Sequence, residues 1–142
     1  MWQVSGKVFL GQNVRIGAGC KINCSEGGTL CIRGNSSINV NSQVICMQNV
    51  CIGENTIISW DDLIMDSDFH YMNDGAGWKD VSKPINIGNY VWVGCRATVL
   101  KGSNVPDGCV VAANSVITRN FPEKNCLLTT NGITKKNISW RR

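Results

Sequence analysis

The sequence predicts an all-β solenoid, a triangular prism of parallel strands, from two features of its hydrophobic pattern. An aliphatic residue recurs at every sixth position over the second half of the chain, at Ile87, Val93, Val99, Val105, Val111 and Ile117. This period fits neither the repeat of an α-helix nor simple strand alternation. Short fixed periods are typical of solenoids, so we expect three six-residue units to form one coil with three flat faces.

The same period extends through most of the preceding chain, with slips between blocks. Three earlier blocks start at Leu10, Ile32 and Ile52. We expect their aliphatic side chains to point inward and stack in columns, with coils about 4.8 Å apart. Asn, Gly and Asp are expected at the corners, where they tolerate turn geometry. The slips near Gly27 and Val50 are short and predict corner bulges.

Two segments depart from the period. The residues from Phe69 to Pro84 lack it and are rich in Gly, Asp and aromatic residues, so we expect an extruded loop; long loops on rigid scaffolds often carry function. The period ends after Ile117. We therefore expect a hexapeptide-repeat domain over 1–122 and a closing segment over 123–142. That segment should lie back along the coils, with Trp140 and its aliphatic residues covering exposed backbone.

Composition excludes several classes of protein. A chain of 142 residues with 43% hydrophobic content is expected to form one packed domain. No apolar run approaches the roughly 20 residues of a membrane span, and no signal-peptide pattern is present, so the cytoplasm is the expected location. The net charge of +4 lies largely near the C-terminus. Nucleic acid is not expected as a partner because interleaved aromatic residues are lacking; a phosphorylated small molecule and a solvated tail remain open.

The eight cysteines raise the alternatives of a disulfide scaffold and a zinc site. No CxxC pair occurs and no export signal indicates an oxidising compartment. Cys20 and Cys109 occupy the small fifth position of the repeat, where cysteine acts as a compact hydrophobic residue. We expect the cysteines to pack in the core, with Cys20 and Cys24 the one pair left open, and we expect no metal.

The single histidine lies where the period breaks. His70 falls six residues after Ile64, at a position that an aliphatic residue holds elsewhere, and Asp66 and Asp68 precede it. A neutral imidazole can remove a proton from a hydroxyl, and a neighbouring carboxylate would fix its tautomer. His70 is therefore a candidate general base. A hydrogen-bonded histidine at the base of a loop is the alternative.

Taken together, the hexads, the loop beside His70 and the segment from Trp92 to Pro122 resemble the hexapeptide-repeat acyltransferases, which form a left-handed β-helix. The galactoside, maltose and polysaccharide O-acetyltransferases are the nearest branch. The resemblance implies that His70 is the general base for direct attack of a hydroxyl on the thioester of acetyl-CoA. The family motif W-[IV]-G-[SC] matches Trp92-Val93-Gly94-Cys95. It implies that the Cys95 main-chain N–H binds the oxyanion and that Trp92 flanks the thioester.

The resemblance also implies where the two substrates bind. The family segment that lines the pantetheine arm corresponds to 112–119, and Ala113, Thr118 and Arg119 carry over. The loop that holds the adenine and 3′-phosphate is absent; Lys135 and Lys136 stand in that region and are expected to meet the phosphates. For the acceptor, Asp61 replaces a family Asn. Asp62 and Asp68 are expected beside it, and three aromatic residues can stack on a sugar or lie at a subunit contact: Trp60, Tyr71 and Trp78.

The function that the resemblance implies is O-acetylation of a sugar hydroxyl, in surface polysaccharide synthesis, by a homotrimer with sites between subunits. A catalytically idle β-helix that serves as a binding scaffold is one alternative, and an acetyltransferase for a small non-sugar acceptor is another. The γ-carbonic anhydrases share the prism but hold zinc with three histidines, which a single histidine cannot supply.

Overall fold

The computed structural model describes residues 1–142 and contains eighteen β-strands and no helix. The strands form three sheets. The first sheet contains β1 (Trp2–Val4), β4 (Lys21–Cys24), β7 (Gln43–Cys46), β10 (Leu63–Met65), β13 (Thr98–Leu100) and β16 (Val116–Ile117). The second contains β2 (Lys7–Leu10), β5 (Thr29–Ile32), β8 (Asn49–Ile52), β11 (Ile85–Ile87) and β14 (Asn104–Val105). The third contains β3 (Arg15–Ile16), β6 (Ser37–Ile38), β9 (Ile57–Ile58), β12 (Trp92–Val93), β15 (Val110–Val111), β17 (Leu127–Thr129) and β18 (Gly132–Lys135).

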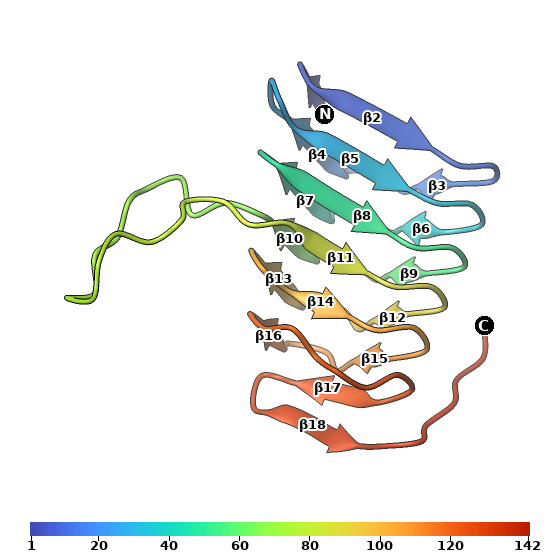
Figure 1. Cartoon of the computed structure of the whole chain (residues 1–142). Helices are drawn as coiled ribbons and strands as arrows, with labels where there is room; N and C mark the ends of the chain where they lie inside the picture. Colours follow the sequence, from blue (N-terminus) through green and yellow to red (C-terminus); the bar gives the residue numbers. More distant parts are fainter.

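Each coil contributes one strand to each sheet in turn, and all neighbouring strands are parallel except β17 and β18, which are antiparallel. In Figure 1 the chain crosses the near face from left to right along β2, β5 and β8, returns behind, and descends. This is the sense of a left-handed coil. The predicted fold class, a left-handed parallel β-helix of hexapeptide repeats with one extruded loop, is confirmed.

The core consists of the predicted aliphatic columns. One column contains Ile22, Val44, Ile64, Val99 and Ile117, which are all buried and pair in register. The prediction that the cysteines pack in the core is confirmed for five of the eight, but Cys31, Cys51 and Cys95 are only half-buried and lie outside the core cluster, which contains Cys20, Cys24, Cys46, Cys109 and Cys126. Leu10 is an exception at 48% exposed, because the first coil is covered on one side only.

The slips in the period all fall at one corner, between the first and second sheets. Thr98 pairs with Val116, which gives a coil of 18 residues, whereas Lys21 pairs with Gln43, a spacing of 22 residues. The additional residues of the earlier coils lie at 25–28 and at 47–48, between the strands of these two sheets. Both predicted corner bulges are confirmed.

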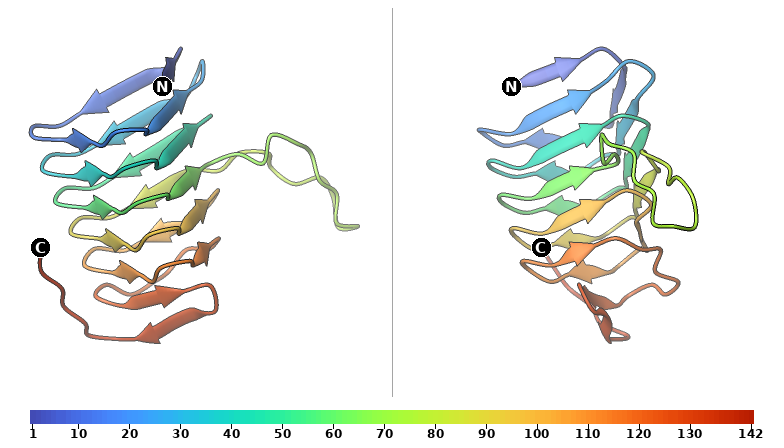
Figure 2. Two further views of the ribbon diagram at one scale, coloured as in Figure 1. Left: turned by 180° about the vertical axis from the view of Figure 1, so that it is seen from behind. Right: turned by 90° about the vertical axis from the view of Figure 1, so that its left-hand side faces the viewer.

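The extruded loop leaves the prism at the same corner, between β10 and β11. Antiparallel bridges join Ser67 to Ser82 and Asn73 to Trp78, so the loop is a hairpin-like arm. Figures 1 and 2 show it projecting well beyond the body of the prism. His70 lies on this arm and is exposed. Its expected place in the hexad pattern was wrong, because the chain has already left the prism when it reaches His70.

The C-terminal segment closes the far end of the third sheet. β17 pairs in parallel with β15, and β18 folds back on β17. The tail then runs back along the outside of the coils, as Figure 2 shows. The Trp140 ring stacks on the Tyr90 ring at a centroid distance of 4.4 Å. Trp140 therefore covers the side of the prism, and β18 covers the sheet edge. The structure contains no helix that could cross a membrane.

Candidate active site

The corner between the third and first sheets brings three predicted site residues together. Turns at 59–62, 94–97 and 112–115 stack there on successive coils. The Arg96 N–H donates to the Trp60 carbonyl oxygen (2.9 Å), and the Asn114 N–H donates to the Cys95 carbonyl oxygen (3.0 Å). The structure therefore places Asp61, Cys95 and Ala113 on one corner, one coil apart.

Left-handed backbone shapes each of these turns. Asp61, Arg96 and Asn114 occupy equivalent positions with φ of 57°, 58° and 59°. Asp and Asn adopt this conformation more readily than most residues, so turn geometry alone accounts for an Asp at position 61.

The main-chain N–H of Cys95 donates to no group within the chain. The N–H groups of Trp60 and Ala113, at the same position of the neighbouring turns, are free in the same way. The N–H groups of Ala18 and Val40 on the earlier coils are also free, so the corner has a column of five unpaired donors, and Cys95 is one of them. A free main-chain N–H is the group that an oxyanion requires.

Trp92 lies on the flat face that leads to this corner. Its Nε1–H donates to the Ser59 hydroxyl (3.2 Å), and its ring lies 6.1 Å from the Trp140 ring at a tilt of 48°. The ring remains 42% exposed. Trp92 is therefore held beside the corner by the preceding coil and by the C-terminal tail, an arrangement that the sequence did not reveal.

The base of the arm fixes the imidazole of His70. Its Nδ1 lies 3.3 Å from the main-chain carbonyl oxygen of Asp68. When Nδ1 carries the proton and donates to this carbonyl, Nε2 is left as the free basic nitrogen. The Asp68 carboxylate is engaged elsewhere, in a 2.5 Å ion pair with Lys101. The main chain, rather than the expected carboxylate, therefore orients the imidazole.

The other two aspartates near these sites are buried and serve the prism. Asp66 accepts the main-chain N–H groups of Met47 (2.7 Å), Gln48 (2.8 Å) and Asn49 (2.8 Å), and so ties the base of the arm to the preceding coil. Asp62 is 2% exposed, with its side chain inside the corner. The expectation that Asp62 lies with Asp61 on the acceptor surface was wrong, because consecutive residues of a turn face opposite sides.

The predicted coenzyme-binding residues lie on the last coils. Thr118 and Arg119 follow β16, and the Arg119 guanidinium donates to the Thr130 carbonyl oxygen (3.2 Å). Lys135 ends β18 and is exposed. Lys136 forms a 2.7 Å ion pair with Glu123, which raises the pKa of the lysine. Arg119 and Lys135 are therefore the cations in this group that no carboxylate neutralises.

His70 and Cys95 do not share a corner within one chain. The arm that carries His70 leaves between the first and second sheets, and Cys95 lies between the third and first. Figure 1 shows the arm directed away from its own coils.

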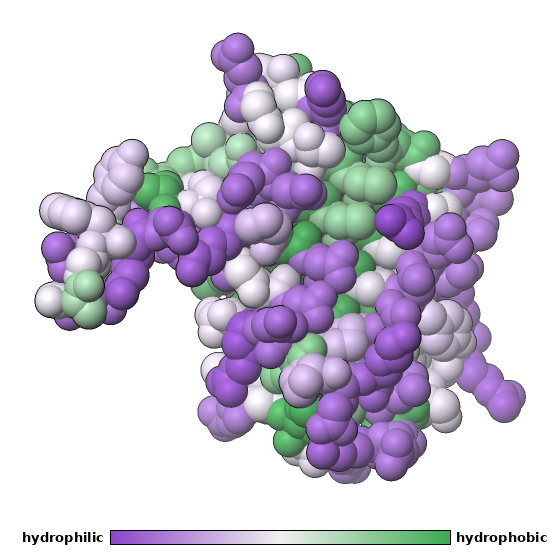
Figure 3. Space-filling view, viewed as in Figure 1, coloured by the Kyte–Doolittle hydropathy of each residue, from purple (hydrophilic) through white to green (hydrophobic).

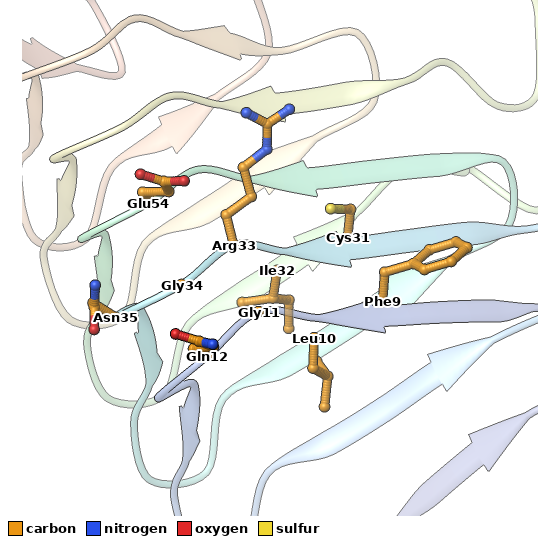
Figure 4. Close-up of a pocket in the computed structure, with 10 residues that line it drawn as sticks. All are labelled: Phe9, Leu10, Gly11, Gln12, Cys31, Ile32, Arg33, Gly34, Asn35 and Glu54. Carbon is orange, nitrogen blue, oxygen red and sulfur yellow. The ribbon is translucent and has the colours of Figure 1, made fainter.

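A shallow groove of about 460 Å³ lies over the first coils, and none of the predicted site residues lines it. Figure 4 shows Arg33 and Glu54 at one side and Phe9 and Leu10 at the other. In Figure 3 this upper part of the near face is more apolar than the lower coils. The groove is therefore separate from the candidate active site.

Comparison with known proteins identifies relatives. The putative lipopolysaccharide biosynthesis O-acetyl transferase WbbJ of Escherichia coli K12 is 26% identical over 132 residues, which cover 86% of this chain and 67% of WbbJ. The polysialic acid O-acetyltransferase of E. coli O1:K1 is 32% identical over 123 residues, covering 83% of this chain but only 40% of that protein. No protein-family profile matches the chain.

Among solved structures, the hexapeptide-repeat acetyltransferase VCA0836 of Vibrio cholerae O1, in complex with acetyl coenzyme A, superposes with a TM-score of 0.65 and 25% identity. The match covers 86% of this chain and 70% of that one. Matches also include galactoside, maltose and polysialic acid O-acetyltransferases. With the repeat, the three-sheet prism and the arm, these relatives show that the chain belongs to the hexapeptide-repeat acetyltransferase family.

Proposed function

We propose that the protein transfers an acetyl group from acetyl-CoA to a hydroxyl of a sugar in a surface polysaccharide. The names of the relatives support both substrates: one matched structure is a complex with acetyl coenzyme A, and two relatives are named for lipopolysaccharide and polysialic acid O-acetylation. The contact between His70 Nδ1 and the Asp68 carbonyl oxygen carries the mechanistic part, because it leaves Nε2 free to act as a base.

The proposed reaction is a direct transfer. His70 Nε2 takes the proton of the acceptor hydroxyl while its oxygen forms a bond to the thioester carbonyl carbon. The Cys95 N–H donates to the oxyanion that develops. The carbon–sulfur bond then breaks, and the imidazolium returns its proton to the leaving thiolate. The products are the O-acetyl sugar and coenzyme A, and no covalent bond to the protein forms.

We propose a homotrimer in which the arm of one subunit completes the site on its neighbour. Two features support it: His70 and Cys95 lie at different corners of one prism, and the arm carries apolar side chains with no cover. Tyr71 is 77% exposed and Trp78 is 72% exposed. Phe69 and Met72 on the same arm are exposed as well, and apolar side chains that gather on one exposed segment mark a contact with another molecule.

The two substrates would lie along the corner that holds Cys95. Ala113 and Thr118 would line the pantetheine arm, and Arg119, Lys135 and Lys136 would meet the coenzyme phosphates. Arg119 is suited to this role because its guanidinium is a planar donor. Asp61, on the coil before Cys95, and Asp68, at the base of the arm, would accept hydrogen bonds from the sugar, and Trp92 would flank the thioester and the sugar.

The experiment is a comparison of His70→Asn with Asp74→Asn, a change on the same arm at a residue that pairs with Lys79 and has no role in the proposed site. Acetylated product is measured by mass spectrometry with acetyl-CoA and candidate oligosaccharides. We expect a loss of at least about a hundredfold in kcat for His70→Asn, the contribution typical of a general base, and none for Asp74→Asn. Wild-type turnover in His70→Asn would refute the base.

The binding of acetyl-CoA separates this proposal from a catalytically idle scaffold. Calorimetry with acetyl-CoA is expected to show binding that weakens in Arg119→Ala. No binding at millimolar acetyl-CoA would refute the proposed donor and favour the scaffold.

A further inference from the structure

Side-chain hydrogen bonds form a ladder inside the corner between the second and third sheets. The Ser36 hydroxyl donates to the Gly53 carbonyl oxygen (2.6 Å) on the next coil, and the Thr56 hydroxyl donates to the Gly88 carbonyl oxygen (2.8 Å). Each hydroxyl also accepts one main-chain N–H from the next coil: Ser36 from Thr56 (2.9 Å), and Thr56 from Val91 (3.1 Å). One hydroxyl at each step thus satisfies one carbonyl and one N–H.

The corner that holds Cys95 repeats this ladder. The Cys20 thiol donates to the Asn39 carbonyl oxygen (3.0 Å). Ser42 donates to the Ser59 carbonyl oxygen (2.9 Å) and accepts the Asp62 N–H (3.1 Å). The next step belongs to Asp62.

At this step a carboxylate, which can only accept, lies where the steps described above have a hydroxyl or thiol donor. Asp62 Oδ1 accepts the Ala97 N–H (2.8 Å), as the ladder requires. Asp62 Oδ2 is buried and has no hydrogen-bond partner. Val93 pairs with Ile58, so Gly94 corresponds to Ser59, the acceptor of the step before.

The Gly94 carbonyl oxygen accepts no hydrogen bond within the chain, and Gly94 is buried. The step therefore contains two unpaired acceptors and lacks one donor. A proton on Asp62 Oδ2 would supply that donor and complete the ladder, since a protonated carboxyl donates one hydrogen bond and still accepts others.

The surroundings of Asp62 favour the protonated form. Burial raises the pKa of Asp62 to about 7, and the charge of Asp61 on the same turn adds to the rise. The turn below carries Cys95 and Arg96, which face outward, and the turn above, at 38–42, carries no ionisable side chain. The other buried polar side chains on this corner are the hydroxyls of Ser42, Ser59 and Ser115. No cation therefore faces the buried oxygen.

The Gly94 carbonyl and the Cys95 N–H belong to the same peptide group. A donor on the carbonyl polarises the peptide and makes its N–H a stronger donor, and it also fixes the peptide plane. We propose that protonated Asp62 is a positioning residue that hydrogen-bonds the Gly94 carbonyl and so fixes the Cys95 N–H for oxyanion binding. This inference rests on the proposed function of Cys95. Ionisation of Asp62 would place a carboxylate against the carbonyl and remove this support.

The first test follows the Cys95 amide by 15N NMR of the full chain between about pH 5 and pH 9. We expect the Ala97 and Cys95 amides to titrate with one shared midpoint, because Asp62 contacts the first directly and the second through Gly94. In Asp62→Asn the side-chain amide donates to Gly94 and accepts from Ala97 at every pH. Both titrations should vanish, and the Cys95 amide should stay near its low-pH position.

Asp61→Asn is the matched control, since it removes the exposed carboxylate of the same turn. Its Cys95 titration should persist with a somewhat lower midpoint. A titration of Ala97 without one of Cys95 would overturn the inference, as would a Cys95 titration that survives in Asp62→Asn.

The second test is the pH profile of kcat. Each pH unit above the Asp62 midpoint lowers the protonated fraction about tenfold, so wild-type kcat should fall on the alkaline side and Asp62→Asn should not. Equal alkaline limbs in both proteins would overturn the inference. Absence of acetyl transfer in both would instead count against the proposed function, because the NMR test needs no substrate.

Discussion

The stability of the prism should depend on pH through Asp62, and Asp62→Asn should remove that dependence. Asn is isosteric with a protonated Asp and keeps both hydrogen bonds of the ladder step. The unfolded chain holds Asp62 at the ordinary pKa of 3.8, whereas burial raises it to about 7 in the folded chain. Between these values the folded protein binds a proton that the unfolded chain does not bind.

The magnitude follows from this difference. A shift of about three pKa units corresponds to about 4 kcal/mol at roughly 1.4 kcal/mol per unit. The full stability from this group is present below about pH 4, where both states are protonated. It falls as the pH rises and is lost by about pH 8. This direction is opposite to that of a surface carboxylate in an ion pair, such as Asp74 with Lys79, whose pKa is lowered.

The assay is urea unfolding of the wild type and Asp62→Asn at several pH values between about 4 and 9. The quantity to compare is the difference between their free energies of unfolding, since all other titrating groups cancel in it. From the acid end to the alkaline end of this range, we expect the free energy of unfolding of Asp62→Asn to rise by about 4 kcal/mol relative to that of the wild type. Parallel curves would refute the reasoning, because they would mean that folding leaves the pKa of Asp62 unchanged.

Two further changes test the anchors of the arm and of the coenzyme. Asp66→Ala removes the acceptor of three main-chain N–H groups and should lower the free energy of unfolding by about 3 kcal/mol, measured by urea unfolding. An unchanged free energy of unfolding would show that these three hydrogen bonds do not stabilise the fold. Arg119→Ala should raise the Kd of acetyl-CoA roughly tenfold, the loss of one charge-assisted hydrogen bond. Lys136→Ala should change that Kd less in the same calorimetric titration, because Glu123 already pairs with Lys136.

The period of the sequence predicts the columns of the core because a buried position tolerates few residue types. Ile64 and Val99 fall in one column, although the arm separates them in sequence. The break in the period locates the arm in the sequence, but it does not show from which corner of the prism the arm leaves. Its insertion at the corner of the two bulges follows from strand pairing, which the period does not encode. His70 shows the consequence: counting by six continues through a segment that has left the coil.

The site residues on the turns were predictable in part. In the turn at 58–62 two aspartates are adjacent, and composition does not distinguish them. The repeat does: Asp62 is the fifth residue counted from Ile58, the position that Cys20 and Ser42 hold inside other coils. Its burial could therefore have been derived from the sequence. The ion pair of Asp68 with Lys101 could not, because it joins the arm to a coil that follows it in the chain.

If the only role of Asp62 is to complete the ladder, a carboxyl lowers the free energy of unfolding at neutral and alkaline pH for no structural benefit. Ser42 makes the same two hydrogen bonds one coil earlier with a group that stays neutral at every pH. Asp62→Ser should therefore be more stable than the wild type above about pH 8, with a free energy of unfolding that no longer falls through Asp62. If it also lacks the alkaline loss of kcat, the carboxyl has no structural advantage over a hydroxyl, and its distinct effect is to couple the Gly94–Cys95 peptide to pH. If Asp62→Ser is instead less stable at every pH, the larger side chain is needed to fill the corner, and packing is the reason for its presence.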